Sequence, residues 1–260
     1  MGQNILIEHD AACTVLTLNR PEKLNPLDWS TVRELKEAVN QLGAGPPVLV
    51  TGAGRAFCAG GDLTGYIGLY KRPEDFRAFL FDFRDMLVAI ERSERIFIAA
   101  INGACAAGGL ELLLACDIVL AAQDAQIGDA HLNFGQLPGA GGSQRLPRAI
   151  GSLRAKHLML SGRFLSGQEA MDIGLANEVV PGSELMPRAR AFARKLVEHS
   201  PGGLRGVKHL VNQGMGMPLA EALEFEIDYV HRYATTDTDA TEGLRAFAEK
   251  RQPAYRSFKG

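Results

Sequence analysis

The chain has 260 residues, of which 46% are hydrophobic and 22% charged, and its formal net charge is −2. This is the composition of an ordinary globular protein, and it excludes the strongly basic surface typical of nucleic-acid-binding proteins. The length suits one large α/β domain, alone or with a helical appendage.

The chain carries no sign of export or of a membrane-spanning segment. Its first ten residues lack the basic and apolar regions of a signal peptide, and no apolar run reaches the length of a membrane span. The four cysteines form no CxxC pair and lie in apolar segments, so we expect free thiols rather than disulfides or a metal site. We therefore expect a cytoplasmic protein that binds neither nucleic acid nor a membrane.

In the first half of the chain, apolar strands alternate with amphipathic helices. A strand hairpin at 4–8 and 13–18 precedes a helix at 29–42, for which Asp28 is the expected N-cap. A short buried strand at 48–51 then leads into a glycine-rich loop. The next elements that we expect are a helix at 74–92, a strand at 96–101, a helix at 110–116 and a strand at 117–121. The order strand, glycine loop, helix thus occurs twice, as in α/β folds.

The second half reads as predominantly helical. A loop rich in glycine and proline is expected at 137–148. The helices that we expect after it lie at 152–160, 166–173, 184–199, 218–232 and 238–250. The last two carry apolar stripes that need a partner surface. We place a division near residue 200, with a core at 1–200 and a helical region at 201–260.

The two glycine loops are the first candidates for chemistry. One surrounds Gly61 and the other surrounds Gly108, and each follows a buried strand, where α/β folds place ligands. Two such loops could aim two backbone N–H groups at one oxygen, and each donor is worth roughly 3–4 kcal/mol of barrier in enzymes that use this device. The alternative is that both loops are tight turns needed for packing. Neither loop matches a Walker or dinucleotide-binding pattern.

Six segments, in order along nearly the whole chain, resemble the crotonase (enoyl-CoA hydratase/isomerase) superfamily. They are NRPEKLNPL (19–27), AFCAGGDL (56–63), INGACAAGGLELLLACDI (101–118), LPGAGGSQRLPRAIG (137–151), LSGRFLSGQEAMDIGLANEVV (160–180) and EGLRAFAEKRQPAY (242–255). The resemblance implies an α/β spiral of ββα units with a C-terminal helical trimerisation region. It also implies self-association as a homotrimer or hexamer.

The resemblance further implies an acyl-CoA thioester as substrate, held without a metal or a separate cofactor. Gly61 and Gly108 would supply the N–H groups of an oxyanion hole. Phe247 and Lys250 match positions that reach the coenzyme A of a neighbouring subunit. The positions that match the coenzyme A and substrate contacts within one subunit are Lys23, Leu24, Ala59, Asp62 and Leu63. For Asp62, capping of the following helix is a second interpretation.

The acid/base positions decide the reaction, and here the sequence departs from the family pattern. Hydratases of this superfamily use two glutamates around a water. Glu111 occupies the first position, three residues after Gly108, but His131 occupies the second. We expect both to be catalytic, although Glu111 could instead satisfy loop backbone groups and His131 could be structural. Asp129 could orient His131 or lie in solvent.

We therefore expect an acyl-CoA lyase that hydrates a 2-enoyl-CoA. The alternatives are hydrolysis, isomerisation or decarboxylation with the same oxyanion hole, or acyl-CoA binding without catalysis. Gly139 stands where a dienoyl isomerase would carry a further acid, which argues against that activity. Tyr66, Tyr70 and Phe83 could line an acyl pocket, although aromatic residues at this spacing also suit core packing.

Overall fold

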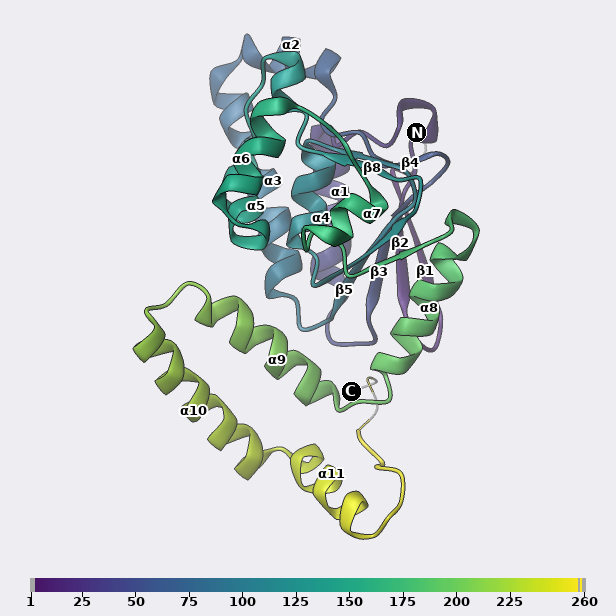
Figure 1. The fold of residues 1–260 in the computed structure, drawn as a ribbon, viewed down its shortest axis with the longest axis vertical. Coiled ribbons are helices and arrows are strands. Elements are labelled where there is room, and N and C mark those ends of the chain that lie inside the picture. The colour runs from purple at the N-terminus through teal and green to yellow at the C-terminus, as the bar shows by residue number, and fades with distance from the viewer. Residues whose placement is uncertain (1–2, 257, 259–260) are drawn as a thin grey trace.

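The computed structural model describes residues 3–256 and 258 and contains two sheets (Figure 1). The strands of the larger sheet, in spatial order, are β1 (Ile5–His9), β2 (Thr14–Leu18), β3 (Val48–Gly52), β5 (Phe97–Ile101), β7 (Ile118–Ala122) and β10 (Glu178–Val180). Those of the smaller sheet are β4 (Ala56–Cys58), β6 (Ala104–Ala106), β8 (Gln126–Gly128) and β9 (Leu165–Ser166). The α/β class and the N-terminal hairpin, in which β1 pairs antiparallel with β2, are confirmed.

The fold repeats one unit of two strands and a helix. Strands β3, β5 and β7 lie side by side and parallel in the larger sheet, and each is followed by a short strand of the smaller sheet. These short strands, β4, β6 and β8, are also parallel neighbours. Helices α2 (Leu63–Tyr70) and α3 (Pro73–Arg92) follow β4, and α4 (Gly108–Ala115) follows β6. Successive units therefore bring the ends of β4 and β6 together, which places the two glycine loops beside each other.

The interior of the core is apolar, as strands buried on both faces require. All residues of β3 and β5 are buried, and helix α4 is buried on every side except at Leu114. Helix α1 (Trp29–Gln41) packs against α3 and begins as expected, since the Asp28 side chain accepts a hydrogen bond from the Thr31 N–H. The other helices of the core are α5 (Gly142–Ile150), α6 (Ser152–Ser161), α7 (Gly167–Asp172) and α8 (Leu185–Leu196), with 3-10 turns η1 (Pro21–Lys23), η2 (His131–Phe134) and η3 (Gly182–Glu184).

The C-terminal helices extend away from the core as an arm (Figure 1). They are α9 (Pro201–Gly214), α10 (Leu219–Thr236), which folds back along α9, and α11 (Thr238–Ala248). Lys208 of α9 anchors the arm, since its buried ammonium donates to the carbonyls of Ile90 and Arg95 and to the Asp117 carboxylate. The exposed apolar side chains of the arm are Val207, Val211, Met215, Leu219, Leu223, Ile227, Val230, Leu244 and Phe247. In the part of the chain that the structure describes, no helix is long and apolar enough to cross a membrane.

Two sequence-based expectations about the loops were wrong. Residues 142–150 form helix α5 rather than part of a loop, although Pro147 lies inside it. The helix persists because Leu146 and Ile150 are buried in the core and because the Glu111 side chain accepts the Gly142 N–H. The segments read as glycine loops also begin with strands β4 and β6, which are too short to produce an alternating pattern.

Candidate functional site

A cavity of 660 Å³ lies where the two glycine loops meet. It is largely apolar, with a few polar groups, which is the usual character of a small-molecule site. The predicted residues that line it are Leu24, Ala59, Gly61, Leu63, Tyr66, Tyr70, Phe83, Gly108, Glu111, His131 and Gly139. The fold thus gathers into one cavity residues that are up to 140 positions apart along the chain (from 24 to 164).

The two glycine loops are in contact at the cavity wall. A β-carbon placed on Gly60 would lie 2.9 Å from Cβ of Ala107 and 3.4 Å from the backbone nitrogen of Gly108. Gly60 has a φ of +103°, a conformation that L side chains rarely adopt. Glycine is therefore required at position 60 both by the close approach of the second loop and by the backbone conformation.

The second loop carries backbone strain immediately before Gly108. Ala107 has φ 48° and ψ −113°, outside the regions that a non-glycine residue normally occupies, at a cost of about 1–3 kcal/mol. Its N–H donates to the Gly128 carbonyl and its carbonyl accepts the Glu111 N–H, so neighbouring backbone groups hold this conformation. Helix α4 begins at Gly108, whose N–H belongs to the unpaired, partially positive end of the helix.

Glu111 is a buried carboxyl that is bound to the opposite cavity wall. The residue is only 2% exposed, and its Oε1 accepts the N–H groups of Ala140 and Gly142, both at 2.8 Å. Burial raises the pKa of Glu111 above its ordinary value, against the opposing effects of the Gly142 N–H, His131 and the Ala140 N–H. Within residues 3–256 and 258, Oε2 accepts no protein hydrogen bond. The carboxyl therefore binds loop backbone with one oxygen and leaves the other without a backbone partner.

His131 and Asp129 form a close pair at the same cavity. Nδ1 of His131 lies 3.1 Å from Oδ2 of Asp129, and the two side chains are 12% and 2% exposed. This is ion-pair distance, but the alignment is outside hydrogen-bond geometry, and among the described residues neither atom has another partner. Asp129 is thus buried rather than in solvent, which removes one of the two interpretations of this residue. Both groups act on the pKa of Glu111, so the three belong to one electrostatic cluster.

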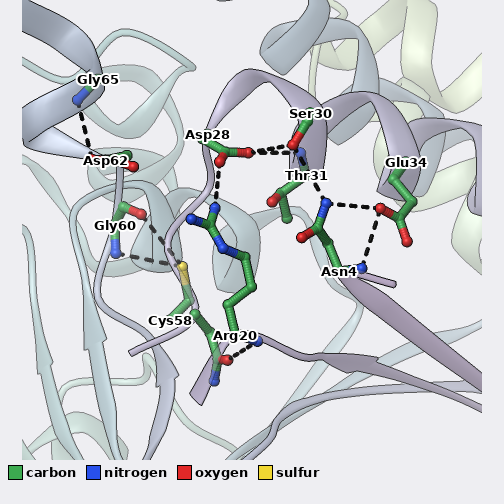
Figure 2. Close-up of polar contacts among 11 residues, drawn as sticks. Asn4, Arg20, Asp28, Ser30, Thr31, Glu34, Cys58, Gly60, Asp62 and Gly65 are labelled. Carbon is green, nitrogen blue, oxygen red and sulfur yellow. Dashed lines mark hydrogen bonds and ion pairs between the residues drawn. The ribbon is translucent and has the colours of Figure 1, made fainter. Parts of the chain in front are cut away.

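The N-terminal segment predicted to contact coenzyme A is fixed to the first glycine loop. The Ala59 N–H donates to the Leu24 carbonyl at 2.9 Å, and the Leu27 N–H donates to the Gly60 carbonyl at 2.8 Å. An ion pair between Arg20 and Asp28 closes this segment (Figure 2). Lys23 is exposed at its outer edge.

The Asp62 side chain accepts the Gly65 N–H at the start of α2, as Figure 2 shows, so the expected capping role is confirmed. The next residue, Leu63, is partly exposed and lines the cavity. Contact of either residue with coenzyme A stays a prediction.

Aromatic side chains form one side of the cavity. Tyr66 stacks on Tyr70 with ring centroids 6.0 Å apart and packs edge-on against Phe76 at 6.2 Å. Its hydroxyl lies against Gly61, since a β-carbon placed there would be only 2.0 Å from that oxygen. Burial raises the pKa of Tyr66, so the hydroxyl stays protonated at neutral pH. Tyr70 donates to Gln136, which joins α2 to the loop on the far side of the cavity.

Two of the predicted residues lie away from this cavity. Phe247 is 85% exposed on α11, and Lys250 follows the end of that helix. The arm that carries both extends from the opposite end of the core (Figure 1). A contact of either residue with coenzyme A therefore requires a second copy of the chain, and it stays a prediction.

Several lining residues were not singled out from the sequence. They are Phe76, Leu80, Phe134, Gln136, Leu137 and Phe164. Half of them come from the segment around 134–140, which has no periodic pattern. The signal that could have pointed to this segment is the family-like motif LPGAGG (137–142), in which the N–H groups of Ala140 and Gly142 donate to Glu111.

Comparisons with known proteins identify the family of the chain. The family model described as Enoyl-CoA hydratase/isomerase matches residues 8–258. A Mycobacterium tuberculosis protein named probable enoyl-CoA hydratase is 37% identical over 97% of this chain and 98% of its own length. A crotonyl-CoA hydratase of Syntrophomonas wolfei is 34% identical over 97% of this chain and 98% of its own length.

The solved structures extend the likeness to three dimensions. An enoyl-CoA hydratase from Bacillus anthracis superposes with a TM-score of 0.92 at 37% identity, covering 97% of this chain and 99% of that one. The crotonase-like fold expected from the sequence motifs is thereby confirmed. The chain is therefore an enzyme that belongs to the enoyl-CoA hydratase/isomerase family.

Proposed function

We propose that this enzyme adds water across the double bond of a 2-enoyl-CoA thioester, giving a 3-hydroxyacyl-CoA. The observation that carries the proposal is the position of Glu111. Its buried carboxyl lines the same cavity as Gly61 and Gly108, and one carboxyl oxygen remains free of backbone hydrogen bonds. Relatives named enoyl-CoA hydratase, crotonyl-CoA hydratase and short-chain-enoyl-CoA hydratase, at 34–37% identity, support it.

In this proposal, the N–H groups of Gly61 and Gly108 hydrogen-bond to the thioester oxygen. These fixed donors stabilise the negative charge that develops there when water attacks C3. Oε2 of Glu111 removes a proton from the water, whose oxygen bonds to C3. The resulting enolate takes a proton at C2 from Nε2 of the doubly protonated His131 ring, which keeps its Nδ1 proton, and Glu111 then returns its proton to Nε2. The net change is the addition of H at C2 and OH at C3, with no cofactor beyond the coenzyme A of the substrate.

We also assign the coenzyme A moiety to the surface around Leu24 and Ala59. Their backbone groups are joined by a hydrogen bond, so they form one continuous edge beside the cavity. Lys23 lies exposed at that edge, where its ammonium can pair with a phosphate. Substitution of Lys23 by alanine should raise KM for crotonyl-CoA several-fold and leave kcat unchanged. The exposed Lys195, on α8, offers a matched control when replaced by alanine.

The decisive assay is the loss of absorbance of the conjugated thioester when crotonyl-CoA and longer or branched enoyl-CoAs are hydrated. Release of free coenzyme A thiol, followed in parallel, detects hydrolysis. Hydration without thiol release is the expected result. Thiol release without hydration would reassign the cavity to thioester hydrolysis. Calorimetric binding of acyl-CoA with no product of either kind would instead indicate a binding protein.

The exposed apolar side chains of the arm lead us to propose a homotrimer, alone or paired into a hexamer. Burying this surface against another copy removes apolar area from water, at roughly 25 cal/mol per Å². Replacement of Leu223 and Ile227 by glutamate should dissociate the assembly in analytical ultracentrifugation. Replacement of the exposed Glu224 by glutamine is the control. A monomeric wild-type protein at micromolar concentration would contradict this assignment.

A further inference from the structure

The least expected feature of the cavity is a buried carboxylate behind His131. Asp129 is 1% exposed, although aspartate is almost never fully buried without a partner. Its Oδ2 is 3.1 Å from Nδ1 of His131, and in the described residues these two atoms have no other partner. A buried polar atom without a hydrogen bond costs about 1–3 kcal/mol, so a hydrogen bond between these two atoms is strongly favoured.

We propose that Asp129 is a positioning residue that holds the His131 ring for proton transfer at Nε2. The inference rests on the function proposed above, because it assigns a partner to one of its two acid/base groups. In free enzymes such hydrogen bonds are often misaligned and tighten when substrate binds, which accounts for the present geometry. A hydrogen bond from Nδ1–H to Asp129 leaves Nε2 as the only ring nitrogen that can exchange a proton with the substrate.

The arrangement is specific to the histidine. The neutral ring that remains after proton transfer has two tautomers, and a fixed partner on Nδ1 keeps the remaining proton there, so Nε2 is free to take the proton that Glu111 returns. The carboxylate also stabilises the imidazolium whenever the ring carries both protons. A glutamate at position 131 would need neither effect, and it would be repelled by the Asp129 charge. Asp129 and His131 therefore form a matched pair, and Glu111 is the separate second group.

The test compares Asp129→Asn with the control Asp124→Asn, which changes an exposed carboxylate on the turn before β8. Asp129→Asn should lower kcat for crotonyl-CoA by about 10²–10⁴-fold, the range for loss of a group that orients a catalytic histidine, with KM within twofold. In a His131→Gln background the same change should cause no further loss. An equal loss of kcat in both backgrounds would show that Asp129 acts only on the fold.

A second measurement does not depend on turnover. Proton–nitrogen NMR of the wild-type enzyme, assigned by comparison with His131→Gln, should show a slowly exchanging Nδ1–H on His131. Asp124→Asn should keep this signal and Asp129→Asn should lose it. Absence of the Nδ1 proton from the wild-type enzyme overturns the inference. If instead the signal is present but no enoyl-CoA is hydrated, the pair stands and the proposed reaction fails.

Discussion

Replacing Glu111 by glutamine and by alanine separates its structural role in the loop from the catalytic role that we propose for it. Oε1 accepts the N–H groups of Ala140 and Gly142, and Oε2 is the oxygen that we assign to chemistry. Glutamine keeps an oxygen acceptor for both N–H groups but cannot remove a proton. Alanine leaves two buried donors without an acceptor. Each costs about 1–3 kcal/mol when unsatisfied, so the alanine variant should lose about 2–6 kcal/mol of unfolding free energy.

The two variants should therefore have similar activities and different stabilities. Both should lose about 10²–10⁴-fold in kcat, the range for removal of a general acid or base, in the crotonyl-CoA hydration assay. Urea unfolding should show a large loss for Glu111→Ala and a change within about 1 kcal/mol for Glu111→Gln, the usual scale of one net hydrogen bond. Wild-type turnover by Glu111→Gln would refute the catalytic role. Equal stability of the two variants would refute the role in holding the loop.

Three further predictions follow from the same contacts. Burial raises the pKa of Glu111, so the folded protein loses stability as the pH rises from the ordinary glutamate pKa to the raised one. The stability of Glu111→Gln relative to wild type should therefore increase with pH over this interval, as urea unfolding at several pH values would show. Lys208→Ala should lower the free energy of unfolding by about 3–5 kcal/mol because it leaves the half-buried Asp117 without its ammonium partner. Lys208→Met combined with Asp117→Asn should recover much of that loss. A loss that persists in the double variant would contradict the ion-pair explanation. Gly61→Ala places a β-carbon 2.0 Å from the Tyr66 hydroxyl, so kcat/KM should fall at least tenfold, and Tyr66→Ala in the same chain should restore part of it.

The periodic parts of the chain could be predicted well, because local patterns determine them. The helix at 29–42 and the strand at 48–51 were placed within one residue of α1 and β3, since their buried faces repeat at the spacing of a helix or a strand. Strands β4 and β6 could not be found in this way. Three residues contain too little pattern, and their pairing is set by the parallel neighbours that the larger sheet brings together.

The sequence predicted which residues line the site but not which of them contact one another. Motif positions named Gly61, Gly108, Glu111 and His131, and all four line one cavity, although their roles stay proposals. The sequence left Asp129 open between a partner of His131 and a solvated side chain. Its spacing of two residues from the histidine fits both interpretations. Only the buried environment, formed by segments distant in the chain, distinguishes them.

The two positions that we propose for acid/base chemistry are held by different contacts, which explains why one departs from the family pattern and the other does not. Glu111 is an acceptor for two backbone N–H groups of the loop that starts α5, so a change there affects the fold as well as the chemistry. The His131 side chain contacts only Asp129 among the polar groups described above, and no backbone group depends on it. Position 131 can therefore exchange a carboxyl for an imidazole at little cost in stability, provided that the residue behind it changes too. Specialisation of the reaction is thus expected at the pair 129 and 131, while the two glycine loops and Glu111 stay constant.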